Sequence, residues 1–568
     1  MNWKNEYKRW LEKTDAAEQL RAMSDDERKD AFYRCLEFGT GGLRGVMGPG
    51  TNRMNIYTVR RATQGLAGEI LDCGAEFAEK GVVIAHDSRN NSRTFALEAA
   101  NVLCANGIKT YLFDGLRPTP ELSFAVRYLG CARGIVITAS HNPKEYNGYK
   151  VYGEDGCQIT LRGAEIILEK INSLDMFTGV KTSSFDEELA KGNISYIGQD
   201  VIEDFYKHVL AEGINTDLCA SSGLKVVYTP LNGTGNKPVR AILKKIGVED
   251  VTVVPEQEYP DGNFPTCPFP NPEIKEALAK GRELCNVVKP DLLLATDPDC
   301  DRVGIAVPSD NGYELFTGNE VGAMLLEYIC SERTKMGTMP ADPVAVKTIV
   351  TTDIAAKIAE EYGVKLIEVL TGFKFIGEQI GFLEDKGQED RYIFGFEESY
   401  GYLAGSYVRD KDAVVASMLI CEMAAFYRTK GISLIQAREN MYKKYGVYVH
   451  SQSSFVCEGV TGMERMKEIM SDLRTNTPKT IGGLTVTRFE DYLASTSVDT
   501  ATGAKTMLTL PKSDVLTFKL TDGASVIIRP SGTEPKIKAY YTTTGTTKAE
   551  ASALEKTISD DFAKILGF

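Results

Sequence analysis

Short runs of consecutive apolar residues recur along the chain, and each run leads into a polar loop. These runs are GVVIA (81–85), KVVY (225–228), DLLLA (291–295), VAVK (344–347) and YIFGF (392–396). Apolar runs of about four to eight residues between turn signals are typical of strands that are buried on both faces. We therefore predict a buried strand at each of these positions.

Helical patterns such as NKPVRAILKKIG (236–247) lie between these strands. Alternating strands and helices predict α/β units with mostly parallel sheets, which bind their ligands at the carboxyl ends of the strands. The last part of the chain differs. Residues 525–543 predict strand, loop and strand, and residues 547–566 predict a closing helix.

Composition narrows the class of protein. The length of 568 residues predicts several domains, and 43% hydrophobic with 25% charged residues is typical of a globular protein in water. A net charge of −13 argues against a general nucleic-acid binder, although it allows a small anionic substrate in a local basic pocket. No apolar stretch approaches the roughly 20 residues that span a membrane, and the charged N-terminus has no signal-peptide core. The twelve cysteines include no CxxC pair, which favours reduced thiols and a cytoplasmic location over disulfides or a zinc site.

The first loop with candidate chemistry follows the apolar run GIVI (134–137). Ser140 and His141 come directly after this strand, and Lys150 follows ten positions after the serine. Asn147-Gly148 favours a tight hairpin turn, which we expect to bring Lys150 back towards Ser140. A turn serine with a surface lysine is the plainer alternative. A hydrolase nucleophile elbow is not favoured, because the pattern Gly-x-Ser-x-Gly is absent here.

The second loop carries Asp297, Asp299 and Asp301 directly after the run LLLA. Alternate side chains of an extended loop point the same way, so we expect the three carboxylates to converge. Two like charges about 4 Å apart repel by about 4 kcal/mol at an effective dielectric constant of about 20, so converging carboxylates require a cation. Oxygen ligands favour Mg²⁺, Ca²⁺ or Mn²⁺ over zinc. An EF-hand is excluded by Arg302 and Pro308, and an exposed acidic turn remains the alternative.

Two further loops carry groups that suit a sugar phosphate. RPSG (529–532) follows a predicted strand, and arginine, hydroxyl and main-chain N–H groups are all phosphate donors. Glu397 and Ser399 stand two positions apart at the end of another strand, where a carboxylate and a hydroxyl would suit sugar hydroxyls. A Pro-Gly hairpin turn and a strand-end surface charge are the respective alternatives.

Taken with other motifs, these loops resemble the α-D-phosphohexomutase family, most closely its longer-chain phosphoglucomutase branch. The motifs, in chain order, are EFGTGGLRG (37–45), HDSRNNS (86–92), TASHNP (138–143), DPDCDR (297–302), TGFKFIG (371–377), FEES (396–399) and RPSGTEP (529–535). The resemblance covers nearly the whole chain. The order and spread of the motifs make it specific, although each is short.

The resemblance implies a fold of three related α/β domains with mixed, mostly parallel sheets and a smaller C-terminal α+β domain, around a central cleft. We predict the domains at residues 1–208, 209–311, 312–452 and 453–568. They would carry, in that order, the phosphoserine loop, the metal loop, the sugar-recognition loop and the phosphate-binding loop.

The resemblance also implies a role for individual residues. Ser140 would carry the catalytic phosphoryl group, with positive or proton-handling groups around it at Arg44, His141, Lys150 and Arg302. Mg²⁺ would be bound by Asp297, Asp299, Asp301 and a phosphoserine oxygen of Ser140. The substrate would be held by Thr371, Gly372, Lys374, Glu397, Ser399, Lys411, Arg529, Ser531, Gly532 and Thr533.

The activity implied is the interconversion of glucose 1-phosphate and glucose 6-phosphate through a phosphoserine enzyme and a bisphosphate intermediate. Mg²⁺ would be the cofactor and glucose 1,6-bisphosphate the activator. Phosphomannomutase and phosphopentomutase activities of the same family are alternatives, as are a metal-dependent phosphatase and a non-catalytic phosphosugar-binding protein. We expect small sugar phosphates as partners, with no nucleic acid or membrane, and a monomer or small homo-oligomer.

Overall fold

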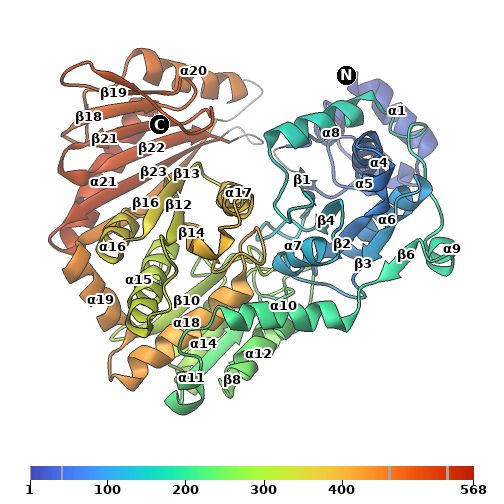
Figure 1. The fold of residues 1–568 in the computed structure, drawn as a ribbon. Coiled ribbons are helices and arrows are strands. Elements are labelled where there is room, and N and C mark those ends of the chain that lie inside the picture. Colours follow the sequence, from blue (N-terminus) through green and yellow to red (C-terminus); the bar gives the residue numbers. More distant parts are fainter. Residues whose placement is uncertain (1, 40–41, 458–461, 532–535) are drawn as a thin grey trace.

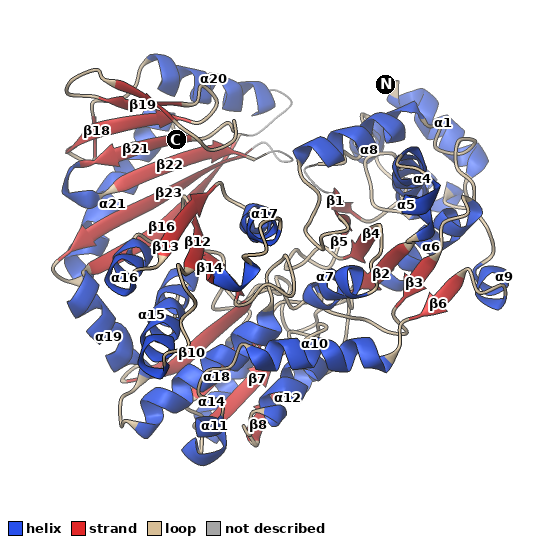
Figure 2. Ribbon diagram, viewed as in Figure 1, coloured by secondary structure: helices blue, strands red, loops and turns tan. Residues whose placement is uncertain are grey.

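The computed structural model describes residues 2–39, 42–457, 462–531 and 536–568, and it contains four sheets with helices packed against them (Figure 1). Strands and helices alternate along the chain in the first three domains. In the fourth sheet most strands follow one another directly, with no α-helix between them (Figure 2). The predicted strands, the strand pair of residues 525–543 and the closing helix are all confirmed. None of the described helices is both long and apolar enough to cross a lipid bilayer.

The first sheet has the strand order β1-β5-β4-β2-β3-β6. Its strands are β1 (Gly42–Val46), β2 (Val82–His86), β3 (Thr110–Leu112), β4 (Arg133–Ile137), β5 (Tyr146–Tyr152) and β6 (Ile194–Tyr196). The helices of this domain are α1 (Trp3–Lys13), α2 (Ala17–Ala22), α3 (Asp25–Phe32), α4 (Ile56–Asp72), α5 (Ala75–Glu79), α6 (Ser92–Ala105), α7 (Thr119–Tyr128), α8 (Leu161–Ser173), α9 (Phe185–Ala190) and α10 (Gln199–Ala211).

The second and third sheets have the orders β11-β10-β9-β7-β8 and β13-β12-β14-β15. The second domain contains α11 (Asp217–Ser222), β7 (Lys225–Thr229), α12 (Asn236–Lys245), β8 (Asp250–Val253), α13 (Pro255–Glu258), α14 (Ala279–Val288), β9 (Leu292–Thr296), β10 (Val303–Ser309) and β11 (Gly312–Leu315). The third contains α15 (Gly318–Met336), β12 (Val344–Thr348), α16 (Ile354–Tyr362), β13 (Lys365–Val369), α17 (Phe373–Glu384), η1 (Glu389–Arg391), β14 (Tyr392–Glu397), β15 (Gly401–Leu403), α18 (Ala413–Thr429) and α19 (Leu434–Tyr445).

The fourth sheet is antiparallel and belongs to the C-terminal domain. Its elements are β16 (Val447–Val456), α20 (Gly462–Thr475), β17 (Thr480–Ile481), β18 (Leu484–Asp491), β19 (Thr496–Asp499), β20 (Lys505–Met507), β21 (Leu516–Leu520), η2 (Thr521–Gly523), β22 (Ser525–Pro530), β23 (Lys536–Gly545) and α21 (Lys548–Leu566). The fold is therefore three α/β domains followed by a C-terminal domain of another type.

The first three sheets share one local design. In each, one parallel strand turns back into an antiparallel neighbour, as β4 into β5, β9 into β10 and β14 into β15. Each of these connections contains a non-glycine residue with a left-handed backbone, with φ of 51° at Ser140, 52° at Cys300 and 65° at Tyr400. The motifs TASHNP, DPDCDR and FEES lie at these three connections.

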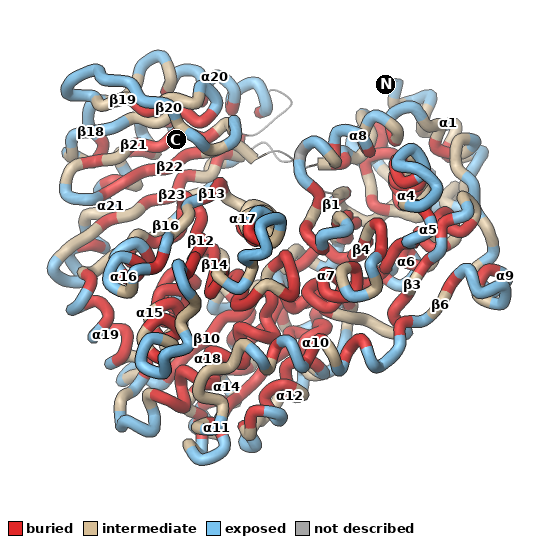
Figure 3. Tube along the Cα trace, viewed as in Figure 1, coloured by how far each residue is buried: buried red, intermediate tan, exposed pale blue. Residues whose placement is uncertain are grey.

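Burial on both faces explains the apolar runs. In β2, Val83 and Ala85 enter one core while Val82 and Ile84 enter another on the opposite face. The core containing Val83 continues through the second and third domains, where α18 is almost wholly buried (Figure 3). The C-terminal domain has a core of its own. The loops that carry TASHNP, DPDCDR and FEES therefore rest on the core that runs through the first three domains.

The prediction that Asn147 and Gly148 form a tight turn is wrong. Both residues lie inside β5, and the connection from β4 consists of residues 138–145. Glycine is required at position 148 because a Cβ there would lie 2.5 Å from the carbonyl oxygen of Thr138 and 2.9 Å from that of Leu43. The chain still folds back, since β5 pairs with β4, but the longer loop makes the turn.

Three of the predicted domain limits fall inside structural units. The limits after residues 208, 311 and 452 cut α10, the hairpin of β10 and β11, and β16. We propose limits after Ala211, Phe316 and Gly446, because these leave each helix, hairpin and strand whole.

Candidate active site

Ser140 lies in the connection between β4 and β5 and is only 3% exposed. Its main-chain N–H donates to Oγ1 of Thr138 at 2.8 Å. Its Oγ donates to Oδ2 of Asp297 at 2.7 Å and lies 3.2 Å from Nδ1 of His141. The structure thus places the serine hydroxyl of the first domain directly against the aspartate loop of the second.

The three aspartates converge as predicted. They are at most 1% exposed, and one oxygen of each carboxylate lies within 4.8 Å of the others. The expectation of an extended loop is wrong, however. The main-chain N–H of Cys300 donates to the carbonyl oxygen of Asp297 at 2.9 Å, and Oδ1 of Asp297 accepts from the N–H groups of Asp301 and Arg302. A tight turn closed by Asp297 itself brings the carboxylates together.

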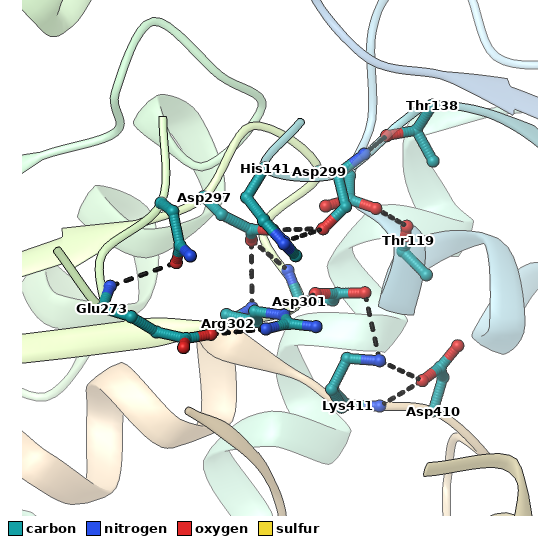
Figure 4. A network of polar contacts seen from close by, with 12 residues as sticks. Thr119, Thr138, His141, Glu273, Asp297, Asp299, Asp301, Arg302, Asp410 and Lys411 are labelled. Atoms are coloured by element: carbon teal, nitrogen blue, oxygen red, sulfur yellow. Dashed lines mark hydrogen bonds and ion pairs between the residues drawn. The ribbon is translucent and has the colours of Figure 1, made fainter. Parts of the chain in front are cut away.

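Two lysines from different domains partly balance this negative charge, and Figure 4 shows one of them, Lys411, beside Asp301 and Asp410. Nζ of Lys150, on β5, lies 3.0 Å from Oδ2 of Asp299 and 3.6 Å from Oδ2 of Asp301. Nζ of Lys411 lies 3.3 Å from the same oxygen of Asp301 and 3.2 Å from Oδ1 of Asp410. The predicted residues of the first, second and third domains therefore meet in one buried cluster.

Burial and charge shift the pKa values in this cluster. Burial, then the neighbouring carboxylates, raise the pKa of Asp297 and of Asp301. Burial also acts to raise the pKa of Asp299, but Lys150, a hydrogen bond with Asp297 and Lys411 together outweigh it, and the pKa is lowered. Burial acts to lower the pKa of Lys150, and Asp299 and Asp301 outweigh it, so the ammonium form is favoured.

The aspartates fit a divalent cation. Oδ1 of Asp299 and Oδ1 of Asp301 are buried and have no hydrogen-bond partner among the described residues. A buried carboxylate oxygen without a donor is costly, and a cation would satisfy both atoms. Because every candidate ligand here is a carboxylate oxygen, the donor set suits a hard ion such as Mg²⁺.

His141 and Arg302 lie beside the cluster. Burial, followed by the positive charges of Arg302 and Arg44, holds the pKa of His141 well below its usual range, so its imidazole is neutral at neutral pH. Nη1 of Arg302 lies 2.6 Å from Oε1 of Glu273, which fixes the guanidinium next to the metal loop. Arg44 is exposed on β1, where its Nη1 lies 3.3 Å from Oδ1 of Asn142 in the serine loop.

The predicted sugar-binding residues lie around the end of the third sheet. Glu397 is the buried last residue of β14, while Ser399 lies in the following turn and is partly buried. A bridge between Arg302 and Gly401 joins this hairpin to the metal loop. Thr371 and Gly372 precede α17, and Lys374 lies in its first turn. The ring centre of Phe373 lies 5.6 Å from Nζ of Lys411, which links this segment to the cluster.

The predicted phosphate loop is described only in part. Arg529 is on β22, where its Nε donates to the hydroxyl of Tyr540 at 3.4 Å, and Ser531 donates its main-chain N–H to the carbonyl of Lys536. Gly532 and Thr533 lie outside the described residues. Among the described residues, the side chain of Arg529 bonds to Tyr540 and not to the aspartate cluster.

Several contributing residues were not predicted from the sequence. Thr119, at the start of α7, donates its main-chain N–H to the carbonyl of Asp299 and its hydroxyl to Oδ2 of the same residue. Glu273 holds Arg302, and Asp410 holds Lys411. Thr119 and Glu273 belong to no motif. Only Asp410 carried a signal, as the neighbour of a predicted lysine.

Comparison with protein families agrees with this architecture. Residues 36–177, 203–311 and 317–445 match the α/β/α domains I, II and III of the phosphoglucomutase/phosphomannomutase family, and residues 476–560 match its C-terminal domain. The chain belongs to the phosphoglucomutase/phosphomannomutase family. It is accordingly an isomerase of the mutase type.

Individual relatives narrow the comparison. The chain is 36% identical over 536 residues to a phosphoglucomutase of Staphylococcus saprophyticus, covering 94% of this chain and 95% of that protein. It is 38% identical over 522 residues to a phosphoglucomutase of Staphylococcus aureus strain MRSA252, covering 91% of each.

Solved structures with less similar sequences share the fold. The open form of pp63/parafusin, a phosphoglucomutase from Paramecium, has a TM-score of 0.68 at 18% identity and covers 94% of this chain and 95% of its own. A phosphoglucomutase/phosphomannomutase family protein from Burkholderia thailandensis has a TM-score of 0.65 at 19% identity, covering 93% and 96%.

Proposed function

We propose that this protein is an α-phosphoglucomutase, which interconverts glucose 1-phosphate and glucose 6-phosphate. The observation that carries the proposal is the 2.7 Å contact between Oγ of Ser140 and the buried aspartate cluster. Such a contact suits a nucleophile that carries a phosphoryl group beside a cation. Similarity to curated phosphoglucomutases over more than nine-tenths of the chain supports the choice of substrate.

The proposed cycle has two phosphoryl transfers. Phosphorylated Ser140 gives its phosphoryl group to the free hydroxyl of a glucose monophosphate, which yields glucose 1,6-bisphosphate and the free serine. The bisphosphate turns around, and Ser140 takes the other phosphoryl group, which releases the isomeric monophosphate. His141, whose imidazole is neutral, accepts the proton of the attacking sugar hydroxyl, and Lys150, Arg302 and Lys411 offset the charge of the moving group.

The other predicted residues would hold the sugar and its second phosphate. Glu397 and Ser399 would bind sugar hydroxyls, helped by the loop of residues 371–374. Arg529 and Ser531, with Gly532 and Thr533, would bind the phosphate that does not react, because arginine and hydroxyl donors suit either phosphate of the bisphosphate. Remote binding of this kind positions the reacting group.

Asp297, Asp299 and Asp301 would hold Mg²⁺. When bound, the ion supplies positive charge that offsets the phosphoryl and carboxylate charges. Glucose 1,6-bisphosphate would act as activator, because it phosphorylates Ser140 in any enzyme that has lost its phosphoryl group.

The test is a steady-state comparison of substrates with Mg²⁺ and a trace of glucose 1,6-bisphosphate. We expect kcat/KM to be highest for glucose 1-phosphate, with mannose 1-phosphate and ribose 1-phosphate as competitors. A higher value for either competitor would move the protein to another activity of the family. Release of inorganic phosphate without an isomeric product would indicate a phosphatase instead.

A further inference from the structure

Arg89 follows β2 and lies beneath the serine loop. Its side chain is fully buried, with 0% exposure, and so is that of its ion-pair partner Asp87. A buried arginine that touches none of the proposed substrate groups needs a reason, because taking a charge out of water is costly.

All four Nη hydrogens of Arg89 have acceptors on the serine loop. Nη1 donates to the carbonyl oxygens of Pro143 at 2.8 Å and Tyr146 at 3.1 Å. Nη2 donates to the carbonyl oxygens of Ser140 at 2.5 Å and of Asn142. One planar guanidinium therefore fixes four main-chain carbonyls between positions 140 and 146, which a single ammonium group cannot do with the same geometry.

The serine loop needs such support because of the backbone at Ser140. Its φ of 51° is left-handed, a conformation that costs a residue with a Cβ about 1–2 kcal/mol. Oγ1 of Thr138 accepts a hydrogen bond from the N–H of Ser140, and Arg89 donates a hydrogen bond to the carbonyl oxygen of Ser140. The two peptide groups that flank the serine are thereby fixed, and with them the direction of Oγ.

Arg89 is itself held from several sides. Its Nε lies 3.4 Å from Oδ2 of Asp87, whose Oδ1 accepts from the main-chain N–H of Arg89 and from the hydroxyl of Ser92. The ring of Phe264, from the second domain, lies 5.1 Å from its Cζ. The guanidinium is therefore a preformed part of the site.

We propose that Arg89 is a positioning residue for phosphoryl transfer. Its guanidinium holds Ser140 in the left-handed conformation that directs Oγ at the aspartate cluster. The inference rests on the proposed function. It assigns to Arg89 an effect on the reacting serine and none on the binding of the sugar phosphate.

Arg89→Lys and Arg89→Ala test the proposal, with Arg93→Ala as the matched control, since Arg93 is an exposed arginine at the start of the following helix, α6. Circular dichroism and thermal unfolding first establish that each variant is folded. A misplacement of about 1 Å costs about a hundredfold in rate, so we expect kcat of both Arg89 variants to fall by about that factor. KM should stay within about threefold, because ground-state binding is not removed.

Chemical rescue separates positioning from a general structural role. In Arg89→Ala, millimolar methylguanidinium should restore kcat by at least about tenfold by refilling the vacated space, and methylammonium should not. Arg93→Ala should keep wild-type kinetics with or without either cation. The proposal is overturned if a folded Arg89→Ala keeps the wild-type kcat. It is also overturned if KM alone changes, or if the two cations act equally.

A readout without substrate keeps this inference distinct from the proposed function. Hydrogen–deuterium exchange of the peptide covering residues 138–146 should be faster in Arg89→Lys than in wild type or Arg93→Ala. If the wild-type protein fails to isomerise glucose 1-phosphate but the exchange result holds, the proposed function is wrong and the support by Arg89 stands. Unchanged exchange in Arg89→Lys would contradict the inference, whatever the activity.

Discussion

Oγ of Ser140 lies 2.7 Å from Oδ2 of Asp297, although 157 positions separate the two residues in the chain. The contact joins the hairpin loop of the first sheet to the equivalent loop of the second. The loops of two domains thus bring the proposed nucleophile and the three buried carboxylates together in one place.

Replacement of Ser140 should separate activity from stability. Ser140→Ala and Ser140→Gly should both lose mutase turnover, and intact-mass analysis should no longer find a phosphoryl group. The free energy of unfolding should be about 1 kcal/mol higher for Ser140→Gly than for Ser140→Ala, because only glycine takes the left-handed φ of 51° without steric cost. Full turnover in either variant would remove Ser140 from the mechanism.

Asp299→Asn should weaken the binding of Mg²⁺ by at least about tenfold, because it removes one charge from the ligand set at nearly equal size. Chelation should abolish wild-type activity and Mg²⁺ should restore it. Mg²⁺ should also raise the unfolding temperature of the wild type far more than that of the variant. Asp310→Asn, in an exposed turn of the same domain, serves as the control. An unchanged Mg²⁺ requirement in Asp299→Asn would reduce the cluster to an ordinary acidic turn.

Arg529→Ala tests the other end of the proposed site. A charged hydrogen bond to phosphate contributes roughly 1.5–3 kcal/mol, so kcat/KM should fall by about tenfold to a hundredfold through both parameters. The affinity for Mg²⁺ should stay unchanged, because Arg529 lies in a different domain from the aspartates. Arg488→Ala, an exposed arginine on β18, is the control. Wild-type kinetics in Arg529→Ala would mean that the phosphate is held elsewhere.

The imidazole of His450 should make the free energy of unfolding depend on pH. It lines a pocket of about 70 Å³ with Glu320 and Lys548, and its buried Nε2 has no hydrogen-bond partner in the described part of the chain. Burial lowers its pKa to about 4. Because the unfolded chain takes up the proton first, near pH 6.5, stability is full above that pH and falls as the pH drops towards 4.

Urea unfolding of wild type and His450→Asn at two pH values checks this expectation. Between pH values of about 7.5 and 5, the wild type should lose about 2 kcal/mol more than the variant. Thr542, whose Oγ1 lies 3.1 Å from Nδ1 of His450, offers a control as Thr542→Val, which keeps the imidazole and hence the pH dependence. Parallel pH profiles for wild type and His450→Asn would show that the histidine titrates normally.

The buried strands could be predicted from the sequence because both faces of each sheet are covered. A continuous apolar run such as that of β2 then has no competing interpretation as a surface strand. The grouping of Asp297, Asp299 and Asp301 was also predicted, from their alternation in the sequence, although they lie on a tight turn and not on the expected extended loop. The backbone that achieves it was not, because the left-handed φ of Cys300 leaves no mark in residue type.

Contacts between domains could not be predicted in the same way. Thr119 and Glu273 act on residues that are remote in the chain, and neither has a pattern that distinguishes it from an ordinary loop residue. At Asn147 and Gly148 the sequence instead led to a wrong prediction. A local preference for a turn was overridden by the pairing of β5, where glycine is required by the close approach of two carbonyl oxygens.

The two lysines that face the aspartate cluster also set an order of events during synthesis of the chain. Domains fold from the N-terminus as they leave the ribosome, so Lys150 is in place when the aspartates emerge. Lys411, which lies 3.3 Å from Asp301, is synthesised only after most of the third domain. Until then Asp301 lacks one of its two ammonium partners. The nascent protein can therefore hold its first two sheets folded while the proposed catalytic centre still lacks one of its positive charges.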